Sequence, residues 1–231
     1  MDTETKNTAT CRRCGECCRK GGPALHTQDK GLFTGKNAVD LSQVVTLRAG
    51  EPAFDQVRGR VAPLPGELLK LKGANQDWTC VFFNAGENAC GLYDRRPAEC
   101  RALFCQDTTE LAAMYEQDRL TRRDLLPRGH GVLAVMAEHE ALVPPARIAA
   151  LAEALRAGGA EAQDAEFELT RMALADRAFR QSLTERAGIA AEYHEFFFGR
   201  GAEALFAATG LCLRADVRRG VRVQPDPFWR V

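Results

Sequence analysis

The sequence predicts a mainly α fold that carries an irregular, loop-rich cysteine-cluster region and has little β structure. Three observations predict this fold class. Eight of the nine cysteines fall within the first 105 residues, a stretch that is also rich in glycine and proline. In the second half of the chain, apolar residues recur at the spacing of an amphipathic helix. The runs enriched in β-branched or aromatic residues are few and short.

These contrasts predict three regions. Residues 1–10 form a flexible polar tail, residues 11–110 a cysteine-cluster metal-binding domain, and residues 111–231 a helical region packed on it. A chain of 231 residues is long enough to bury a core without disulfide staples. Apolar residues make up 45% and charged residues 27%, as in an ordinary globular protein, and this balance excludes disorder as the main state.

The cysteine region is expected to contain short elements only. Val44–Leu47 and Thr79–Phe83 are predicted to be extended, because both are enriched in β-branched or aromatic residues. Pro65–Leu71 and Pro97–Leu103 are predicted to form helical turns, because each begins with a proline, which suits the first turn of a helix.

The second half is predicted to be mostly helical up to residue 226. Ile148, Leu151 and Leu155 lie on one face of a helix that ends at two consecutive glycines, a common stop signal. The final residues, 225–231, include two prolines and are not expected to be regular. The predicted helices, of which the last is one helix or a pair, cover Thr109–Gln117, Pro145–Ala157, Glu166–Ala187 and Ala190–Thr209.

Charge and hydropathy limit the classes of binding partner and the cellular compartment that we expect. Lys and Arg number 31 and Asp and Glu number 31, so neither nucleic acid nor an anionic membrane surface is the expected partner. No run approaches the roughly 18 apolar residues that a membrane span needs. The polar N-terminus does not resemble a secretory signal, so the expected location is cytoplasmic. In a reducing compartment, clustered cysteines bind metal more often than they form disulfides.

The first cysteine block reads CRRCGECC and contains Cys11, Cys14, Cys17 and Cys18. A spacer of two residues lets two thiolates turn back onto one ion, as in metal knuckles. Three cysteines at successive spacings of this kind also match the start of a bacterial ferredoxin loop. The side chains of the adjacent pair, Cys17 and Cys18, tend to diverge, so they could serve different centres or leave one thiol outside.

The second block contains Cys80, Cys90, Cys100 and Cys105 at long intervals. These intervals argue against a zinc ribbon and fit loops from separate segments that converge on one centre. Eight thiolates are enough for two sites of four cysteines each, or for one site with spares. Buried inert thiols and disulfides are the less favoured alternatives. The ninth, Cys212, lies in an apolar stretch and is expected to be a core thiol.

The chain resembles the YkgJ-type cysteine-cluster family, a zinc- or iron-chelating family with a CxxCxxCC block. The similarity is carried by CRRCGECC and by the segment YDRRPAECRALFC from Tyr93 to Cys105, and it covers roughly residues 11–110. It implies a metal-thiolate domain and leaves the metal open. A similar motif accompanies an iron–sulfur cluster in flagellin lysine methylases, which favours iron. The chain shows no convincing glycine loop for adenosylmethionine.

Three residues beside the cysteines are further candidates. Arg96 and Arg101 could donate hydrogen bonds to cluster sulfur and raise a reduction potential, or could be ordinary surface arginines. His26 follows the first block and could be a metal ligand. The alternative, which we favour because eight thiolates suffice, is that His26 tethers its loop through a hydrogen bond.

The leading hypothesis is a metal-binding protein whose eight cysteines hold an iron–sulfur cluster, as first choice, or zinc, as a close second. Its role would be structural, electron-transferring or redox-sensing. One alternative is a metal-dependent protein-modifying enzyme, although no Ser-His-Asp or H-E-x-x-H pattern is recognisable. Another is a helical interaction module, with a protein partner not yet known, pinned by a structural zinc site.

Overall fold

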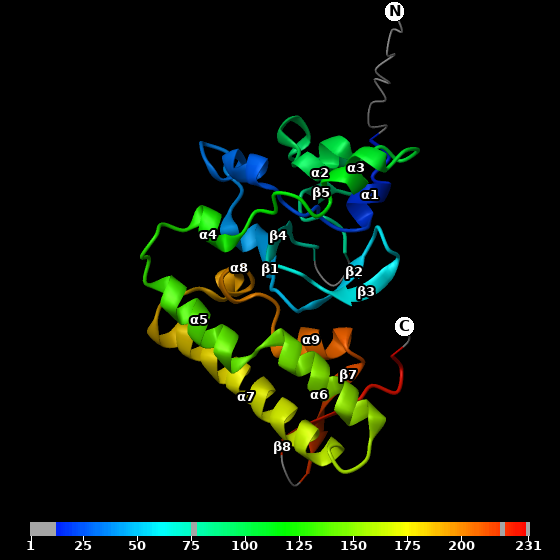
Figure 1. Ribbon diagram of the computed structural model, residues 1–231. Helices are drawn as coiled ribbons and strands as arrows, with labels where there is room; N and C mark the ends of the chain where they lie inside the picture. Colours follow the sequence, from blue (N-terminus) through cyan, green and yellow to red (C-terminus); the bar gives the residue numbers. More distant parts are fainter. Residues whose placement is uncertain (1–12, 75–77, 218–219, 230–231) are drawn as a thin grey trace, which may run out of the picture. The chain divides into compact units, whose positions relative to one another are not determined.

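The structure, a computed structural model, describes residues 13–74, 78–217 and 220–229 (Figure 1). The chain forms two compact units. The cysteine unit comprises Met1–Gln43 and Lys70–Leu120, and the helical unit comprises Val44–Leu69 and Thr121–Val231. The segment 44–69 therefore belongs to the helical unit, although the cysteine segments flank it in sequence. The domain boundary predicted near residue 110 concerns independent folding and stays a prediction.

The cysteine unit consists of short elements. The turn predicted at Pro97–Leu103 is confirmed as α2, and the helix predicted at Thr109–Gln117 ends earlier, as α3. Of the extended run predicted at Thr79–Phe83, only Phe83 lies in a strand. The elements are α1 (Glu16–Arg19), β5 (Phe83–Asn84), β6 (Ala89–Cys90), α2 (Ala98–Ala102), α3 (Thr109–Met114) and the 3₁₀ turns Thr27–Phe33, Leu41–Gln43 and Tyr93–Arg95.

The helical unit contains the long helices. The bounds predicted for Val44–Leu47 and Pro145–Ala157 are confirmed, and the predicted Ala190–Thr209 is a pair of helices separated at Gly199, whose φ is 70°. Its elements are β1 (Val44–Leu47), β2 (Pro52–Asp55), β3 (Arg60–Pro63), α4 (Arg122–Leu125), α5 (Val132–Leu142), α6 (Pro145–Ala157), α7 (Ala162–Arg186), the 3₁₀ turn Ala191–Tyr193, α8 (His194–Phe198), α9 (Ala202–Ala208), β7 (Leu211–Asp216) and β8 (Gly220–Pro225).

The predicted fold class, mainly α with little β structure, is wrong. Of the residues that the structure describes, 45% are helical and 18% are in strands, with several small antiparallel sheets, so the fold is mixed α and β. The described residues form four two-stranded sheets, β1–β4, β2–β3, β5–β6 and β7–β8. Short strands that pair two at a time give a weak periodic signal in sequence, because each presents only two to six residues.

Two predictions of local structure failed for the same reason. Pro65–Leu71 was predicted to be a helical turn, but its second half is strand β4 (Leu68–Leu71). The last part of the helical half is the hairpin β7–β8, in which Leu213 pairs with Val223. In both places the pairing partner along the backbone decides the structure, and a local pattern does not reveal that partner.

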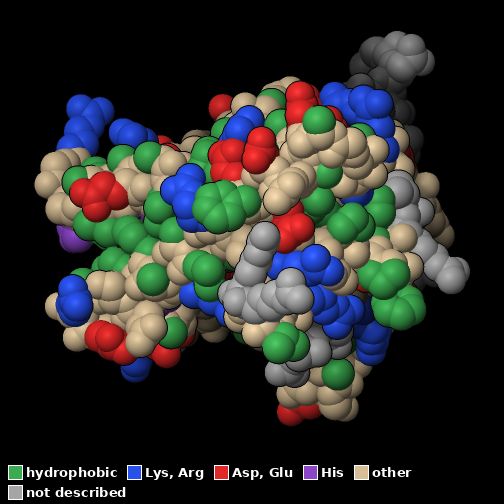
Figure 2. All heavy atoms as spheres, turned by 90° about the horizontal axis from the view of Figure 1, so that it is seen from below, with side chains coloured by type: hydrophobic (Ala, Val, Ile, Leu, Met, Phe, Trp, Pro, Cys, Tyr) green, Lys and Arg blue, Asp and Glu red, His purple; other side chains and the backbone are tan. Residues whose placement is uncertain are grey.

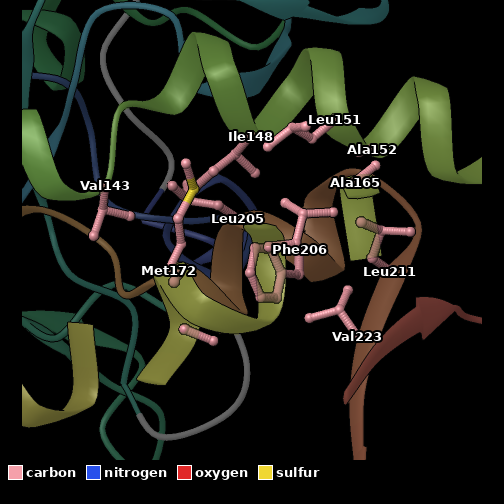
Figure 3. Close-up of a cluster of buried hydrophobic side chains, with 13 residues drawn as sticks. Val143, Ile148, Leu151, Ala152, Ala165, Met172, Leu205, Phe206, Leu211 and Val223 are labelled. Atoms are coloured by element: carbon pink, nitrogen blue, oxygen red, sulfur yellow. The ribbon is translucent and has the colours of Figure 1, made fainter. Parts of the chain in front are cut away.

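The main core of the helical unit lies between α6, α7, α9 and the hairpin β7–β8 (Figure 3). On α6, Ile148 and Leu151 are buried and Leu155 is partly buried, so the predicted apolar face is confirmed. Leu205 and Phe206 of α9 are fully buried against it. Cys212, predicted to be a core thiol, is only partly buried.

A buried polar network joins α5, α7 and α9 beside this core. The ring of His139 on α5 is fully buried, and its Nε2 lies 2.7 Å from Oδ1 of Asp176 on α7. The same carboxylate accepts from Nε of Arg180 at 2.9 Å and from the backbone N–H of Ala202, at the start of α9, at 2.8 Å. Asp176 therefore ties three helices together.

The charge of Arg48 and the burial of the ring determine the protonation state of His139. Nη1 of Arg48 lies 3.4 Å from Nδ1 of His139, and a guanidinium can only donate, so the ring is neutral with its hydrogen on Nε2. Burial first, then the charge of Arg48, lowers the pKa of His139 despite Asp176. Burial would raise the pKa of Asp176, but the hydrogen bond from His139 and the charge of Arg180 lower it to about 2.

We expect the helical unit to lose stability as the pH falls below about 6.5. The folded pKa values of His139 and His194 both lie below the ordinary value of 6.5, mainly through burial, so the unfolded chain takes up protons first. Asp176 contributes stability above pH 3.8 that is lost as the pH falls towards 2. Urea unfolding between pH 7.5 and 5.5 measures the first loss. His139→Gln, which keeps a donor for Asp176, should flatten it, and unchanged wild-type stability over this range would contradict the assignment.

On the face drawn in Figure 2, neither basic nor acidic side chains predominate. Lys and Arg side chains lie there among Asp, Glu and hydrophobic ones. Within the described residues, no helix has both the length and the apolar character that crossing a bilayer requires.

Candidate metal centre

Two cysteines of the first block, Cys17 and Cys18, lie in the single helical turn α1. The turn begins after Gly15, whose φ of 77° lies in the left-handed region. A Cβ on Gly15 would lie 2.5 Å from Cζ of Phe83 and 2.8 Å from Oδ1 of Asn88. Glycine is therefore required there, because the backbone of the first block passes directly against the segment that leads to Cys90.

A direct backbone hydrogen bond joins the two cysteine blocks. The N–H of Cys80 donates to the carbonyl of Cys18 at 2.7 Å. Cys80 itself is buried and pairs across an antiparallel bridge with Gly73. The chain then forms the hairpin β5–β6, in which Phe83 pairs with Cys90. The segments that carry Cys18, Cys80 and Cys90 are thus fixed to each other without any metal.

Asn88 and Arg19 reinforce this junction. Nδ2 of Asn88 donates to the carbonyl of Arg13 at 2.7 Å. Arg19 donates to the carbonyl of Cys14 at 3.1 Å and to Oδ1 of Asn88 at 3.3 Å, while its guanidinium lies 4.8 Å from the ring centre of Phe83. Arg13 and Arg19, which lie at either end of this part of the CxxCxxCC loop, are therefore held against the β5–β6 hairpin.

Tyr93 provides a second connection between the blocks. Its ring contacts two guanidinium groups, that of Arg13 at 3.8 Å and that of Arg96 at 4.0 Å from the ring centre. Arg13 lies in the first block, and Arg96 immediately precedes the proline that opens α2. Tyr93 therefore links the CxxCxxCC loop to the segment that presents Cys100.

Helix α2 carries Cys100, and the buried carboxylate of Asp29 accepts a hydrogen bond from the backbone of its first turn. The backbone N–H of Ala98 donates to Oδ1 of Asp29 at 2.8 Å, which satisfies one of the unpaired donors at the start of the helix. Glu99, the next residue, accepts from the N–H of Ala24 at 2.8 Å and from Arg119 at 3.0 Å. These bonds fix the position of the Cys100 thiol.

Five cysteines from these segments influence one another electrostatically, and we call them the inner thiol group: Cys17, Cys18, Cys80, Cys90 and Cys100. Burial first, then the charge of Cys17, raises the pKa of Cys18 to about 12. Burial, then the charge of Cys80, raises the pKa of Cys100. Burial also raises the pKa of Cys80, with a smaller contribution from Cys90.

The remaining predicted ligands are Cys11, Cys14 and Cys105. Cys14 and Cys105 are exposed, and we call them the outer thiols. Cys11 lies outside the described residues. No disulfide joins any of the eight cysteines that the structure describes. Across residues 13–74, 78–217 and 220–229, no three His, Cys, Asp or Glu side chains lie close enough together to hold a metal ion as they stand.

The chemistry of the inner thiol group nevertheless fits a thiophilic cation. Its thiols raise each other's pKa because several thiolates in one partly buried place repel each other. A bound cation removes that repulsion, since thiolate is the form that coordinates zinc or iron. The loops that carry the thiols are short and irregular, so a modest closure of the group is possible without breaking a long helix or sheet.

The other candidates near the cysteines have oxygen partners. Nδ1 of His26 lies 2.8 Å from the carbonyl of Gln117, and Nε2 lies 3.4 Å from Oε1 of Glu99. The predicted tether of the His26 loop is confirmed, because the N–H of His26 donates to Oδ2 of Asp29 at 2.9 Å. Nε of Arg96 donates to the carbonyl of Tyr93 at 3.0 Å, and Arg101 donates to the carbonyl of Arg96 and to Gln28.

Sequence reasoning missed three residues that build this site. Asn88 and Asp29 act through hydrogen bonds to backbone atoms far away in sequence, and no local pattern marks them. Lys70 lies in a segment that was predicted to be a helical turn. Burial lowers the pKa of Lys70, and the charges of Glu99, Cys80 and Cys100 oppose that shift. The strand character of Lys70 would have been the signal, because it places the residue beside the Cys80 segment.

The thiols of its two blocks make the cysteine unit a thiol-rich domain. Residues 10–117 match the protein-family model CxxCxxCC, described as "Putative zinc- or iron-chelating domain". The match confirms the resemblance seen in the sequence, which covers a little under half of the chain. The match includes both cysteine blocks. No curated protein and no solved structure matches the chain.

Proposed function

We propose that the cysteine unit holds a thiolate-bound metal centre, with the inner thiol group as its principal ligands. The observation that carries this proposal is that five cysteines from four separate segments come together closely enough to interact electrostatically. The match to a zinc- or iron-chelating family supports it. Five thiols exceed the four that a tetrahedral zinc site or an iron–sulfur cluster requires.

An iron–sulfur cluster is the first choice of metal group, and zinc is a close second. The C-x2-C-x2-C start of the first block and the long intervals between Cys80, Cys90 and Cys100 favour the cluster. An all-cysteine zinc site would suit the short, irregular elements of the unit equally well in structural terms. Cys11 and the outer thiols Cys14 and Cys105 remain candidate ligands of a second centre.

The role that follows is structural, electron-transferring or redox-sensing, in a reducing compartment such as the cytoplasm, where thiols persist. Because Tyr93, Asn88 and Arg19 already fix the blocks to one another, the apo-protein can keep its loops near the loaded arrangement. That arrangement reduces the ordering that metal binding has to achieve.

The test is the metal and acid-labile sulfide content of the full-length chain, purified without oxygen. Iron with matching sulfide supports the cluster, and zinc without sulfide supports the second choice. Since no three described ligands converge before loading, metal should also slow amide hydrogen exchange at residues 13–20 and 80–100. Protein that binds neither iron nor zinc, even after reduction and anaerobic reconstitution, would contradict the proposal.

A further inference from the structure

Arg48, the residue that follows β1 in the helical unit, is a buried arginine with one unpartnered nitrogen. Its Nε donates to Oε1 of Glu51 at 2.8 Å, and its Nη1 donates to the carbonyl of Val143 at 3.0 Å. Its Nη2 is sealed from solvent and meets no hydrogen-bond acceptor among the residues that the structure describes. A buried donor without an acceptor is costly in free energy, and such an atom commonly has a water molecule or an ion as its partner.

The acceptors around Arg48 already have other donors. Oε2 of Glu51 accepts from Nε of Arg200 at 2.9 Å, so both oxygens of this fully buried carboxylate are used. Nδ1 of His139 faces Nη1 of Arg48 at 3.4 Å, and Asp176, on the other side of that ring, accepts three hydrogen bonds from elsewhere. Within the described residues, the protein therefore leaves Nη2 for a ligand from solution.

The charges of this network do not balance. Its ionised members are three guanidinium groups and two carboxylates: Arg48, Arg180, Arg200, Glu51 and Asp176. Because the ring of His139 is neutral, one positive charge is in excess. Arg48 and Glu51 are almost completely buried, and the side chains of Arg180 and Arg200 expose only 16% and 17%. Solvent therefore screens the excess charge weakly, which favours a bound anion over a neutral water molecule.

We propose that the helical unit binds one small monovalent anion, of the size of chloride, against Nη2 of Arg48. Two independent observations point to this ligand, the buried donor without an acceptor and the unbalanced positive charge. The anion is small because the atom that binds it is shielded from solvent. Through Arg48 it stabilises the contact of β1 with the end of α5 at Val143, and the site does not depend on the proposed metal centre.

The experiment is urea unfolding of the full-length chain in mixtures of sodium chloride and sodium gluconate at constant pH and ionic strength, since gluconate is too large for the site. Each tenfold rise in chloride above its dissociation constant should raise the urea midpoint by roughly 0.5 M. Arg48→Gln, which lacks both Nη2 and the excess charge, should remove this dependence whatever its own midpoint. Arg147→Gln is the matched control, because Arg147 is an exposed arginine of the same unit, and it should keep the dependence.

A second measurement keeps the proposal testable if Arg48→Gln does not fold. In crystals of the wild-type protein grown with sodium bromide, the anomalous signal of bromide should lie in hydrogen-bond contact with Nη2 of Arg48. A wild-type midpoint that is equal in chloride and gluconate, or a water molecule at Nη2 in the bromide crystals, would overturn the anion site. Arg48→Gln with the chloride dependence of the wild type would also overturn it, because chloride would then act elsewhere on the chain.

Discussion

Replacing Cys100 by serine should remove most of the bound metal from the cysteine unit. Cys100 is held in the inner thiol group by α2, whose start is bonded to Asp29. A serine hydroxyl keeps the size of the side chain but is a much poorer ligand for zinc or iron than a thiolate. We expect the metal content of Cys100→Ser, measured on protein purified without oxygen, to fall to less than about a fifth of the wild-type value.

Two variants serve as controls for this result. Cys212→Ser changes a thiol of the helical unit, on β7, and should leave the metal content unchanged. Cys105→Ser changes an exposed outer thiol only a few residues from Cys100 and should lower the metal content less. Equal losses in Cys100→Ser and Cys212→Ser would show that the loss comes from general destabilisation, and the ligand assignment would be wrong.

Truncation of Asp176 to alanine should be the most destabilising single change in the helical unit. The carboxylate is buried and accepts three hydrogen bonds, from His139, from Arg180 and from the N–H of Ala202. Its removal leaves Arg180 without that carboxylate partner and the first turn of α9 without its acceptor. Breaking a buried charged network from one side typically costs about 3–5 kcal/mol, and we expect a loss of this size in urea unfolding at pH 7.

Glu168→Ala is the control that separates the effect of burial on stability from the loss of an ion pair as such. Glu168 also pairs with an arginine, through Arg147 at 2.6 Å, but that pair lies at the surface. Surface ion pairs contribute about 0–1 kcal/mol, so this variant should be close to wild type. Asp176→Asn, which keeps an acceptor for His139 and lacks the charge, should fall between the two. If Asp176→Ala lost no more stability than Glu168→Ala, the network would not be the link between α5, α7 and α9.

Local patterns predicted the helices well where the pattern alone determines the structure. Helix α6 has the predicted bounds, because its apolar residues recur at helical spacing and Gly158 follows its last residue. The same reasoning predicted the buried face that carries Ile148 and Leu151. Strand β1 also matches, since Val44–Leu47 is rich in β-branched residues.

The strands that were missed depend on partners and not on their own sequence. Leu68–Leu71 fits a helical turn as well as a strand when taken alone, and its pairing with β1 decides between them. In the hairpin β7–β8, Leu211 and Leu213 alternate with other residues, but they follow an alanine-rich helix and were included in a region predicted to be mostly helical. Local propensity is weak, and the backbone hydrogen bonds of a sheet must be satisfied by another segment.

The sequence by itself determined which ligands this protein offers: a block of cysteines at two-residue spacing, a second set at long intervals, and hence a thiol-rich region similar to a zinc- or iron-chelating family. Only the tertiary structure decided which thiols meet, because Cys18, Cys80 and Cys100 are brought together by hydrogen bonds between segments far apart in the chain. Spacing along the chain encodes which ligands are available, whereas their grouping depends on pairing between distant backbone segments, which no local pattern records.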